Sequence, residues 1–271
     1  MVEFYMRFPG FKTRAVTLSY DDGKAFDREM VQILNKYGVK CTFNLNSNLL
    51  DRSNYVTKAE INSLYKGHEV AVHTFTHPHL QSITSGGVAL QIIIDRELLE
   101  SITGNIVKGM AYPFGLAHES IPDIAKTCGI NYARVVSPSY DFSLPKDFLK
   151  WNPTCHHGDE KIYDLIEKFF EEDDLERPWR NTPKVFYIWG HSYEFENNFD
   201  RLEDLCKKLA GNDSVWYATN GEIFDYVNQY KRLDFSLKGG IVHNPTATDI
   251  YTLANCKNLL IPAGKTIIIE E

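Results

Sequence analysis

The sequence lacks the features typical of membrane, exported and nucleic-acid-binding proteins. No apolar stretch approaches the ~20 residues of a membrane-spanning helix, so we expect no membrane span. The N-terminus has no basic segment followed by an apolar one, so no signal peptide is indicated and we expect a cytoplasmic location. No basic run appears and the formal net charge is −7, so phosphate repulsion excludes nucleic acid as an expected partner.

The cysteines lack the spacing of a metal or redox motif. The chain has five of them, an odd number, and no CxxC pair. This indicates reduced, mostly buried thiols in a reducing compartment, with a single disulfide pair as the alternative. The residues concerned are Cys41, Cys128, Cys155, Cys206 and Cys256.

The order of short apolar runs and helical patterns predicts an α/β fold. We expect strands at 15–20, 41–45, 69–72, 107–111, 132–135, 148–151, 185–189 and 215–219. We expect helices at 24–37, 58–65, 87–102, 120–128, 159–171, 198–209 and 222–230. Because strands alternate with helices, residues 1–234 are predicted to form one domain with a parallel sheet or barrel. Residues 235–271 contain strand-like runs between turns and are predicted to form a small β appendage packed on it.

Two neighbouring carboxylates follow the first predicted strand, in the motif Asp21-Asp22-Gly23. Taken alone, the motif is also typical of an ordinary turn after a strand. In the functional interpretation Asp22 binds a divalent metal and Asp21 serves as a base. A dication would remove the repulsion between the two carboxylates and keep Asp21 ionised near neutral pH.

Two histidines, His73 and His77, follow another predicted strand. Pro78 disfavours a helix here, so the segment is predicted to be a tight loop. Two imidazoles and one carboxylate make a three-ligand set with open positions, which suits metal-assisted hydrolysis. Two structural histidines are the alternative.

Two further motifs lie at predicted strand ends. Tyr112-Pro113-Phe114-Gly115 is either a strand-ending turn or a groove wall with backbone N–H groups for an oxyanion. The apolar run that contains Trp189 ends at His191, which is either a core histidine or a general acid. Active sites of barrels assemble at these strand ends.

These motifs, in this order, resemble the polysaccharide deacetylase family, the NodB-like domain of carbohydrate esterase family 4. The resemblance runs from about Arg14 to Tyr230. Residues 17–23 are similar to the family motif TFDDG, and residues 73–77 match H[ST]xxH. Residues 112–115 resemble RxPYG, and residues 188–191 resemble LxLH. The resemblance implies a distorted, incomplete (β/α) barrel.

The resemblance also implies roles for individual residues. Asp22, His73 and His77 would hold the metal, with Zn²⁺ first and Co, Ni, Mn or Fe as alternatives. Asp21 would be the base and His191 the acid.

The groove residues take their roles from the same resemblance. The backbone N–H of Phe114, next to Tyr112, would stabilise the oxyanion together with the metal. Trp189 would border the pocket for the acetyl methyl group.

Three departures from the family pattern indicate a divergent subgroup. Ala111 stands where the family usually has an arginine that positions the base, so Asp21 must be oriented by something else. The family's Asp and Trp pair, which tunes the acid histidine, is not recognisable. We hypothesise that His156 or His157 compensates for that pair. Ser192 replaces an aspartate that often follows the acid histidine.

The function expected from this resemblance is metal-dependent removal of acetyl groups from a carbohydrate, N-acetyl in preference to O-acetyl. The partner would be the acetylated carbohydrate substrate. One alternative is hydrolysis of a cyclic amide or small ureide on the same scaffold. The other is a non-catalytic carbohydrate-binding protein, which the presence of both Asp21 and His191 disfavours.

Overall fold

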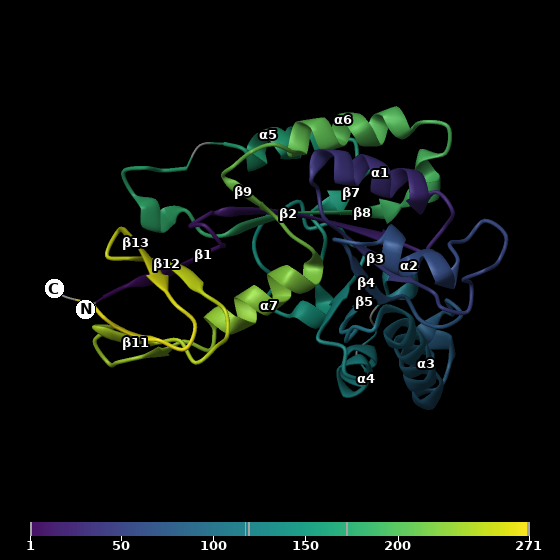
Figure 1. Cartoon of the computed structure of the whole chain (residues 1–271), viewed down its shortest axis with the longest axis horizontal. Helices are drawn as coiled ribbons and strands as arrows, with labels where there is room; N and C mark the ends of the chain where they lie inside the picture. Colours follow the sequence, from purple (N-terminus) through teal and green to yellow (C-terminus); the bar gives the residue numbers. More distant parts are fainter. Residues whose placement is uncertain (1, 117, 119, 172, 270–271) are drawn as a thin grey trace.

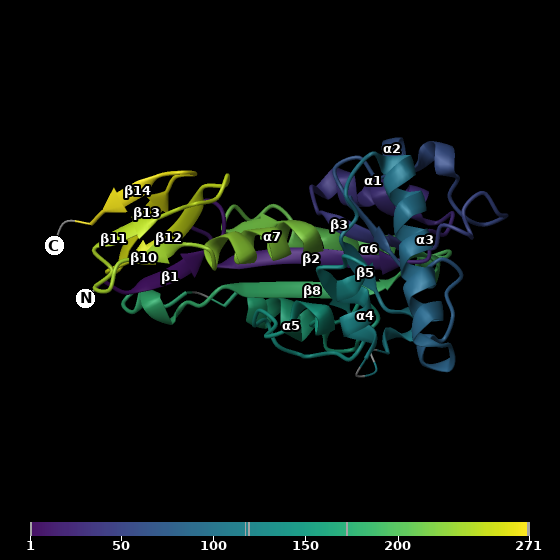
Figure 2. The same ribbon diagram turned by 90° about the horizontal axis from the view of Figure 1, so that it is seen from below.

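The computed structural model describes residues 2–116, 118, 120–171 and 173–269. Its centre is an eight-stranded sheet in which every pairing is parallel (Figures 1 and 2). The strand order is β6-β5-β4-β3-β2-β8-β7, with β9 also paired to β2. The strands are β2 (Arg14–Asp21), β3 (Cys41–Leu45), β4 (Glu69–Val72), β5 (Gly109–Ala111), β6 (Tyr132–Arg134), β7 (Cys155–His156), β8 (Lys184–His191) and β9 (Val215–Tyr217).

The sheet curls into a half-barrel. The barrel is open because β6 and β7, at the two ends of the strand order, do not pair with each other. The α/β fold with an incomplete barrel, predicted from the sequence, is therefore confirmed. Strand β2 lies at its centre and is buried along its whole length. It pairs with β8 throughout, with β9 over Arg14–Val16 and with β3 over Leu18–Asp21.

Helices cover both faces of this sheet, and the last one packs against the inner face, where Asn220 contacts Thr17 of β2 (Figure 1). They are α1 (Asp27–Tyr37), α2 (Ile61–Leu64), α3 (Ser85–Thr103), α4 (Ile121–Thr127), α5 (Ile162–Phe169), α6 (Phe199–Leu209) and α7 (Asn220–Tyr230). Helix α6 buries one stripe at helical spacing, formed by Leu202, Leu205, Cys206 and Leu209. Each such leucine contributes roughly 1.5–3 kcal/mol when it leaves water.

Short 3-10 turns connect several elements, and one of them accounts for a wrong prediction. Residues 148–151 do not form a strand, because the Asp147 side chain accepts a hydrogen bond from Leu149 N and caps the turn η4 (Phe148–Lys150). Residues 58–65 divide into η1 (Lys58–Glu60) and α2. The other 3-10 turns are η2 (Leu80–Ser82), η3 (Pro113–Gly115), η5 (Pro178–Arg180) and η6 (Ser192–Phe195).

Two three-stranded antiparallel sheets form the appendage at one end of the molecule (Figure 2). One contains β1 (Phe4–Arg7), β12 (Ile250–Ala254) and β13 (Lys257–Ile261), and the other contains β10 (Asp234–Phe235), β11 (Ile241–His243) and β14 (Thr266–Ile268). The N-terminal strand thus completes a sheet built mainly from the C-terminal segment. The division of the chain into domains at residue 234 stays a prediction.

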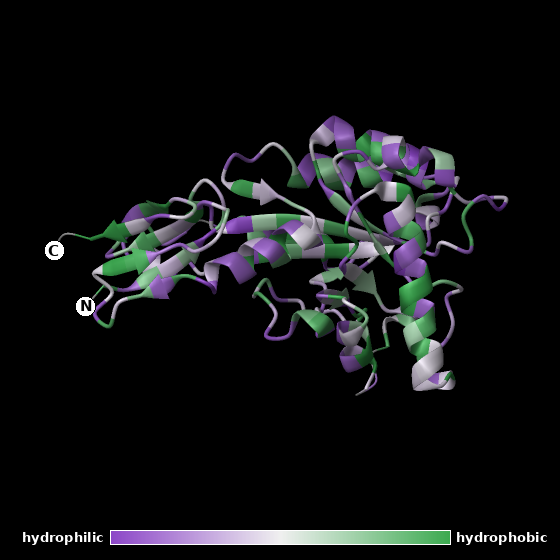
Figure 3. Cartoon of the chain, turned by 60° about the horizontal axis from the view of Figure 1, so that its bottom comes forward, coloured by the Kyte–Doolittle hydropathy of each residue, from purple (hydrophilic) through white to green (hydrophobic). Residues whose placement is uncertain are grey.

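The appendage shares a hydrophobic core with the main sheet. Val242 and Ile261 belong to the same buried cluster as Tyr187 of β8 and Tyr226 of α7. Figure 3 shows hydrophobic residues along the central strands and hydrophilic ones on the outer helix faces. None of the helices in the described ranges has the length and apolarity needed to cross a membrane.

A buried carboxyl group lies in the first turn of α1. Asp27 is fully buried, and the Tyr65 hydroxyl donates to its Oδ2 at 2.6 Å. Burial raises the pKa of Asp27 to about 7. The folded state therefore holds a proton here that the unfolded state loses near pH 4. Stability contributed by this group falls as the pH rises from about 4 to about 7 and is then constant.

We predict that Asp27→Asn stabilises the protein more at pH 8 than at pH 5, because asparagine stays neutral and still accepts the Tyr65 hydroxyl. The difference between the two pH values should reach up to about 3 kcal/mol. Urea unfolding of both variants at both pH values measures it. An equal effect of the substitution at pH 5 and pH 8 would contradict the prediction.

Candidate active site

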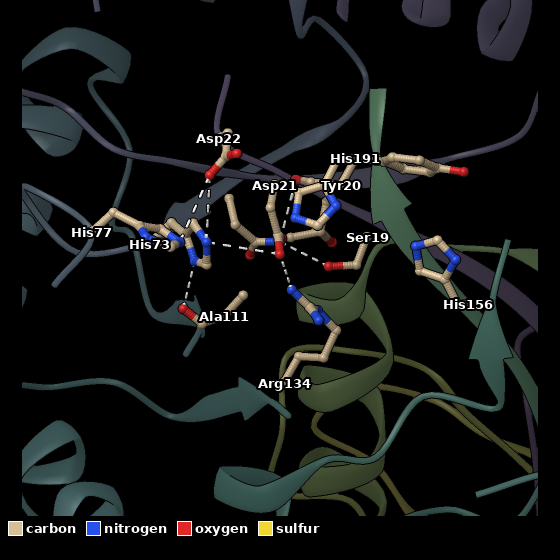
Figure 4. A network of polar contacts seen from close by, with 12 residues as sticks. Ser19, Tyr20, Asp21, Asp22, His73, His77, Ala111, Arg134, His156 and His191 are labelled. Atoms are coloured by element: carbon tan, nitrogen blue, oxygen red, sulfur yellow. Dashed lines mark hydrogen bonds and ion pairs between the residues drawn. The ribbon is translucent and has the colours of Figure 1, made fainter. Parts of the chain in front are cut away.

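The site lies where the C-terminal ends of several parallel strands meet (Figure 4). Asp21 ends β2 and is the register partner of His191, which ends β8. His73 directly follows β4, and Arg134 ends β6. These residues are distant in the sequence, and the topology of the sheet brings them to one edge.

Asp22, His73 and His77 form a compact donor set. One ligand atom from each lies within 4.8 Å of the other two. Asp22 Oδ1 is 3.7 Å from His73 Nε2 and 3.9 Å from His77 Nε2. These separations are too long for hydrogen bonds and a few tenths of an ångström above the roughly 3.4 Å between donor atoms of a tetrahedral zinc ion. The residues therefore fit a divalent metal with nitrogen and oxygen ligands.

The ring of His73 is oriented by the backbone. Its Nδ1 lies 2.8 Å from the carbonyl oxygen of Ala111, which requires a proton on Nδ1 and leaves the lone pair of Nε2 directed at Asp22. Asp95 is buried behind this loop and accepts the backbone N–H of His73 at 3.1 Å. The Asn46 amide donates to the carbonyl oxygen of Thr74 at 2.8 Å. These contacts hold the histidine loop in place.

Left-handed backbone conformations concentrate at the site. Asp22, Thr74, His77 and Phe114 have φ values of 80°, 67°, 56° and 58°. Residues other than glycine rarely adopt this region, and such strain gathers where function requires a particular geometry. The tight loop predicted at His77 is confirmed by its backbone.

The carboxylate of Asp21 is buried and accepts hydrogen bonds from two side chains. Its side chain is 4 % exposed, Oδ1 accepts the Asn44 amide at 2.8 Å, and Oδ2 accepts a hydrogen bond from the guanidinium of Arg134. Arg134 has no exposed side-chain surface, so its charge is neutralised mainly by this carboxylate. Arg134 thus orients Asp21 in this structure.

Arg134 lies on the strand next to Ala111, the position at which the family usually has an arginine. Ala111 on β5 and Arg134 on β6 are register partners in adjacent parallel strands. Partners in register place their side chains on the same face of a sheet. The guanidinium therefore reaches the carboxylate from the strand next to the one expected.

Opposing effects set the pKa of Asp21. Burial alone would raise it, but the positive charge of Arg134, together with His73 and His191, lowers the pKa below its ordinary value. Asp21 is therefore ionised at neutral pH.

The predicted groove residues have different surroundings. Phe114 is 45 % exposed, and its ring stacks on His79 with centroids 3.7 Å apart. Trp189 packs its ring on the guanidinium of Arg134 at 4.5 Å and beside His156. Tyr112 is fully buried and donates its hydroxyl to Leu149 O, so its side chain cannot line a groove.

The second group of polar residues surrounds Glu194 of η6. Glu194 Oε1 lies 3.3 Å from His191 Nδ1, and Oε2 lies 3.0 Å from His156 Nε2 and 3.2 Å from His157 Nε2. Burial would lower the pKa of His191, but the hydrogen bond to Glu194 and the charge of Asp21 raise it above its ordinary value. The hypothesised supporting residues, His156 and His157, are thus linked to His191 through a carboxylate.

Sequence reasoning missed Arg134, Asn44 and Glu194. Arg134 carries a signal, because a charged residue inside the apolar run 132–135 must find a buried partner. Glu194 lies three residues after His191, a spacing at which side chains meet in a helical turn. Neither signal names the partner, because the partners come from other strands.

Comparison with known proteins finds similarity to polysaccharide deacetylases over part of the chain. Residues 10–133 match the family model described as Polysaccharide deacetylase. The chain is 30% identical over 102 residues to a chitin deacetylase of Pestalotiopsis sp, covering 36% of this chain and 33% of that protein. It is 29% identical over 102 residues to a peptidoglycan-N-acetylglucosamine deacetylase of Bacillus cereus, covering 37% and 36%. The chain spans about a third of the length of these curated relatives.

A solved structure shares the fold. The family 4 carbohydrate esterase from Streptomyces lividans, in complex with acetate, superposes with a TM-score of 0.51 at 15% identity and covers 76% of this chain and 93% of that one. Residues 10–133 thus match the polysaccharide deacetylase family model, and the structure has the fold of this esterase. The resemblance stated from the motifs is confirmed.

Proposed function

We propose that the protein is a metal-dependent hydrolase that removes acetyl groups from a carbohydrate, N-acetyl in preference to O-acetyl. The observation that carries the proposal is a metal-type donor set with an ionised carboxylate, Asp21, beside it and a histidine, His191, at the end of the next strand. The name of one curated relative, a peptidoglycan-N-acetylglucosamine deacetylase, supports the N-acetyl preference.

Asp22, His73 and His77 would hold the ion, with Zn²⁺ as the first candidate because two imidazoles and a carboxylate suit it. When bound, such an ion polarises an acyl carbonyl and makes water a better nucleophile near neutral pH.

The protein's own residues supply the proton transfers. Asp21 takes the proton of the attacking water, and Arg134 and Asn44 hold it in position. His191 donates a proton to the departing sugar nitrogen. The lowered pKa of Asp21 and the raised pKa of His191 keep the base ionised and favour the protonated acid.

Two groups at the rim complete the proposed site. The backbone N–H of Phe114, in its left-handed turn, is the proposed donor to the oxyanion. Trp189, held against Arg134, is proposed to border the acetyl methyl group.

The ligand assignment predicts that His77→Ala loses bound metal, because one of three protein ligands is removed. His79→Ala is the matched control, since His79 lies on the same loop and stacks on Phe114 outside the donor set. Metal content after loading with Zn²⁺ and dialysis measures both. Full occupancy in His77→Ala would contradict the assignment.

The proposed activity predicts acetate release from at least one defined N-acetylated oligosaccharide, with more release after addition of Zn²⁺ or Co²⁺. Asp21→Asn should keep its metal but lose roughly 10²- to 10⁴-fold in rate, because the base is removed. A panel of N-acetylated and O-acetylated oligosaccharides and cyclic imides is the measurement. Turnover of imides alone, or normal turnover by Asp21→Asn, would overturn the proposal.

Because Ala111 of β5 and Arg134 of β6 are register partners, we predict that an arginine at position 111 can partly replace Arg134. Arg134→Ala should lower kcat roughly 100-fold, because Asp21 loses its positioning partner. Adding Ala111→Arg to that variant should recover part of the loss, since the side chain at 111 starts on the same face of the sheet. Kinetics of the single and double variants test this. Failure of Arg134→Ala to lower kcat would remove Arg134 from the role.

A further inference from the structure

The carboxylate of Glu194 has oxygen atoms within 3.3 Å of nitrogen atoms of three histidine rings. Its Oε2 also accepts the backbone N–H of His191 at 3.2 Å, in addition to the contacts with His156, His157 and the His191 ring. Burial would raise its pKa, but these histidines hold the pKa of Glu194 far below its ordinary value. A charged carboxylate is thus fixed against the imidazole of His191.

The group around Glu194 has the donor types of a second metal site, because His156, His191 and Glu194 also place ligand atoms within 4.8 Å of one another. Hydrogen bonding explains the geometry better. The N–H of Gly158 donates to His156 Nδ1 at 3.0 Å, so the ring proton lies on Nε2 and points at Glu194. A metal would need a lone pair where this proton is.

We propose that Glu194 is the positioning residue for His191, in place of the Asp and Trp pair that the family uses. Its Oε1 accepts the Nδ1 proton of His191, which leaves Nε2 free to carry the proton that is donated. His156 and His157 act through Glu194 by keeping it ionised and fixed. This inference rests on the proposed function, in which His191 is the proton donor.

Several charged or titratable groups surround His191, and a test has to distinguish the effect of Glu194 from the effects of the others. Those that act on it come from β2 and the residue after it, from η6 and, through Glu194, from β7 and the residue after it. They are Asp21, Asp22, Tyr193, Glu194, His156 and His157. Among the residues that the structure describes, only Glu194 makes a side-chain hydrogen bond to the ring. A substitution at Glu194 therefore isolates its contribution.

The first test compares leaving groups in Glu194→Gln. On an N-acetylated oligosaccharide kcat/KM should fall about 10- to 100-fold, because the departing nitrogen needs a proton. On 4-nitrophenyl acetate, whose leaving group needs none, the fall should be less than about threefold. Glu196→Gln, an exposed glutamate on the same loop, is the matched control and should change neither. Equal losses of Glu194→Gln on both substrates would indicate a general structural defect and overturn the proposal.

The second test needs no turnover. In the zinc-loaded protein, NMR titration of the histidine rings should show the pKa of His191 lowered by about one unit or more in Glu194→Gln. Glu194→Asp, which keeps the charge, should shift it less. An unchanged value in Glu194→Gln would overturn the proposal even if no glycan is a substrate. If the pKa shifts but the unsubstituted protein releases no acetate, the proposed function fails and the role of Glu194 stands.

Metal stoichiometry completes the test. We expect one tightly held zinc ion per chain, lost in His77→Ala and kept in Glu194→Gln. Two ions per chain, one of which is lost in Glu194→Gln, would make Glu194 a ligand and overturn the hydrogen-bonding role.

Discussion

The buried ion pair between Asp21 and Arg134 is the interaction on which the site depends. A guanidinium without exposed surface must be neutralised, and removing one partner of such a pair typically costs about 3–5 kcal/mol. The pair connects β2, the central strand, to β6 at the end of the sheet order. It therefore joins two strands that are not neighbours in the sheet and holds the carboxylate in position. The proposed metal ligand Asp22 is the next residue, so its place follows from the same contact.

Two adjacent carboxylates acquire different roles because their surroundings differ. Asn44 and Arg134 each donate a hydrogen bond to one carboxylate oxygen of Asp21 and hold it in one orientation. Each oxygen keeps a further lone pair that can accept a proton. Asp22 adopts a left-handed backbone that turns its side chain toward His73 and His77. On an extended strand the two side chains would face opposite sides. The left-handed turn at Asp22 instead brings both carboxylates close to His73 Nε2, at 3.8 Å for Asp21 and 3.7 Å for Asp22.

The sequence predicted the parts of the fold and site that are encoded locally. Strands 41–45 and 69–72 were predicted with their observed bounds, because short apolar runs between turns are typical of buried parallel strands. The donor residues Asp22, His73 and His77 belong to contiguous motifs and could be identified. Arg134 and Glu194 could not be paired with their partners, because those contacts depend on strand order and register. The wrong strand at 148–151 shows that a side-chain cap can override an apolar pattern.

The register relation between Ala111 and Arg134 has a consequence for how diverged relatives are judged. A charged side chain can serve a site from any position that places it close enough. In a parallel sheet, the register partner on the neighbouring strand is such a position. Loss of a signature residue is therefore weak grounds for declaring a homologue inert. The informative check is whether the adjacent strand has gained the same chemical group at the paired position.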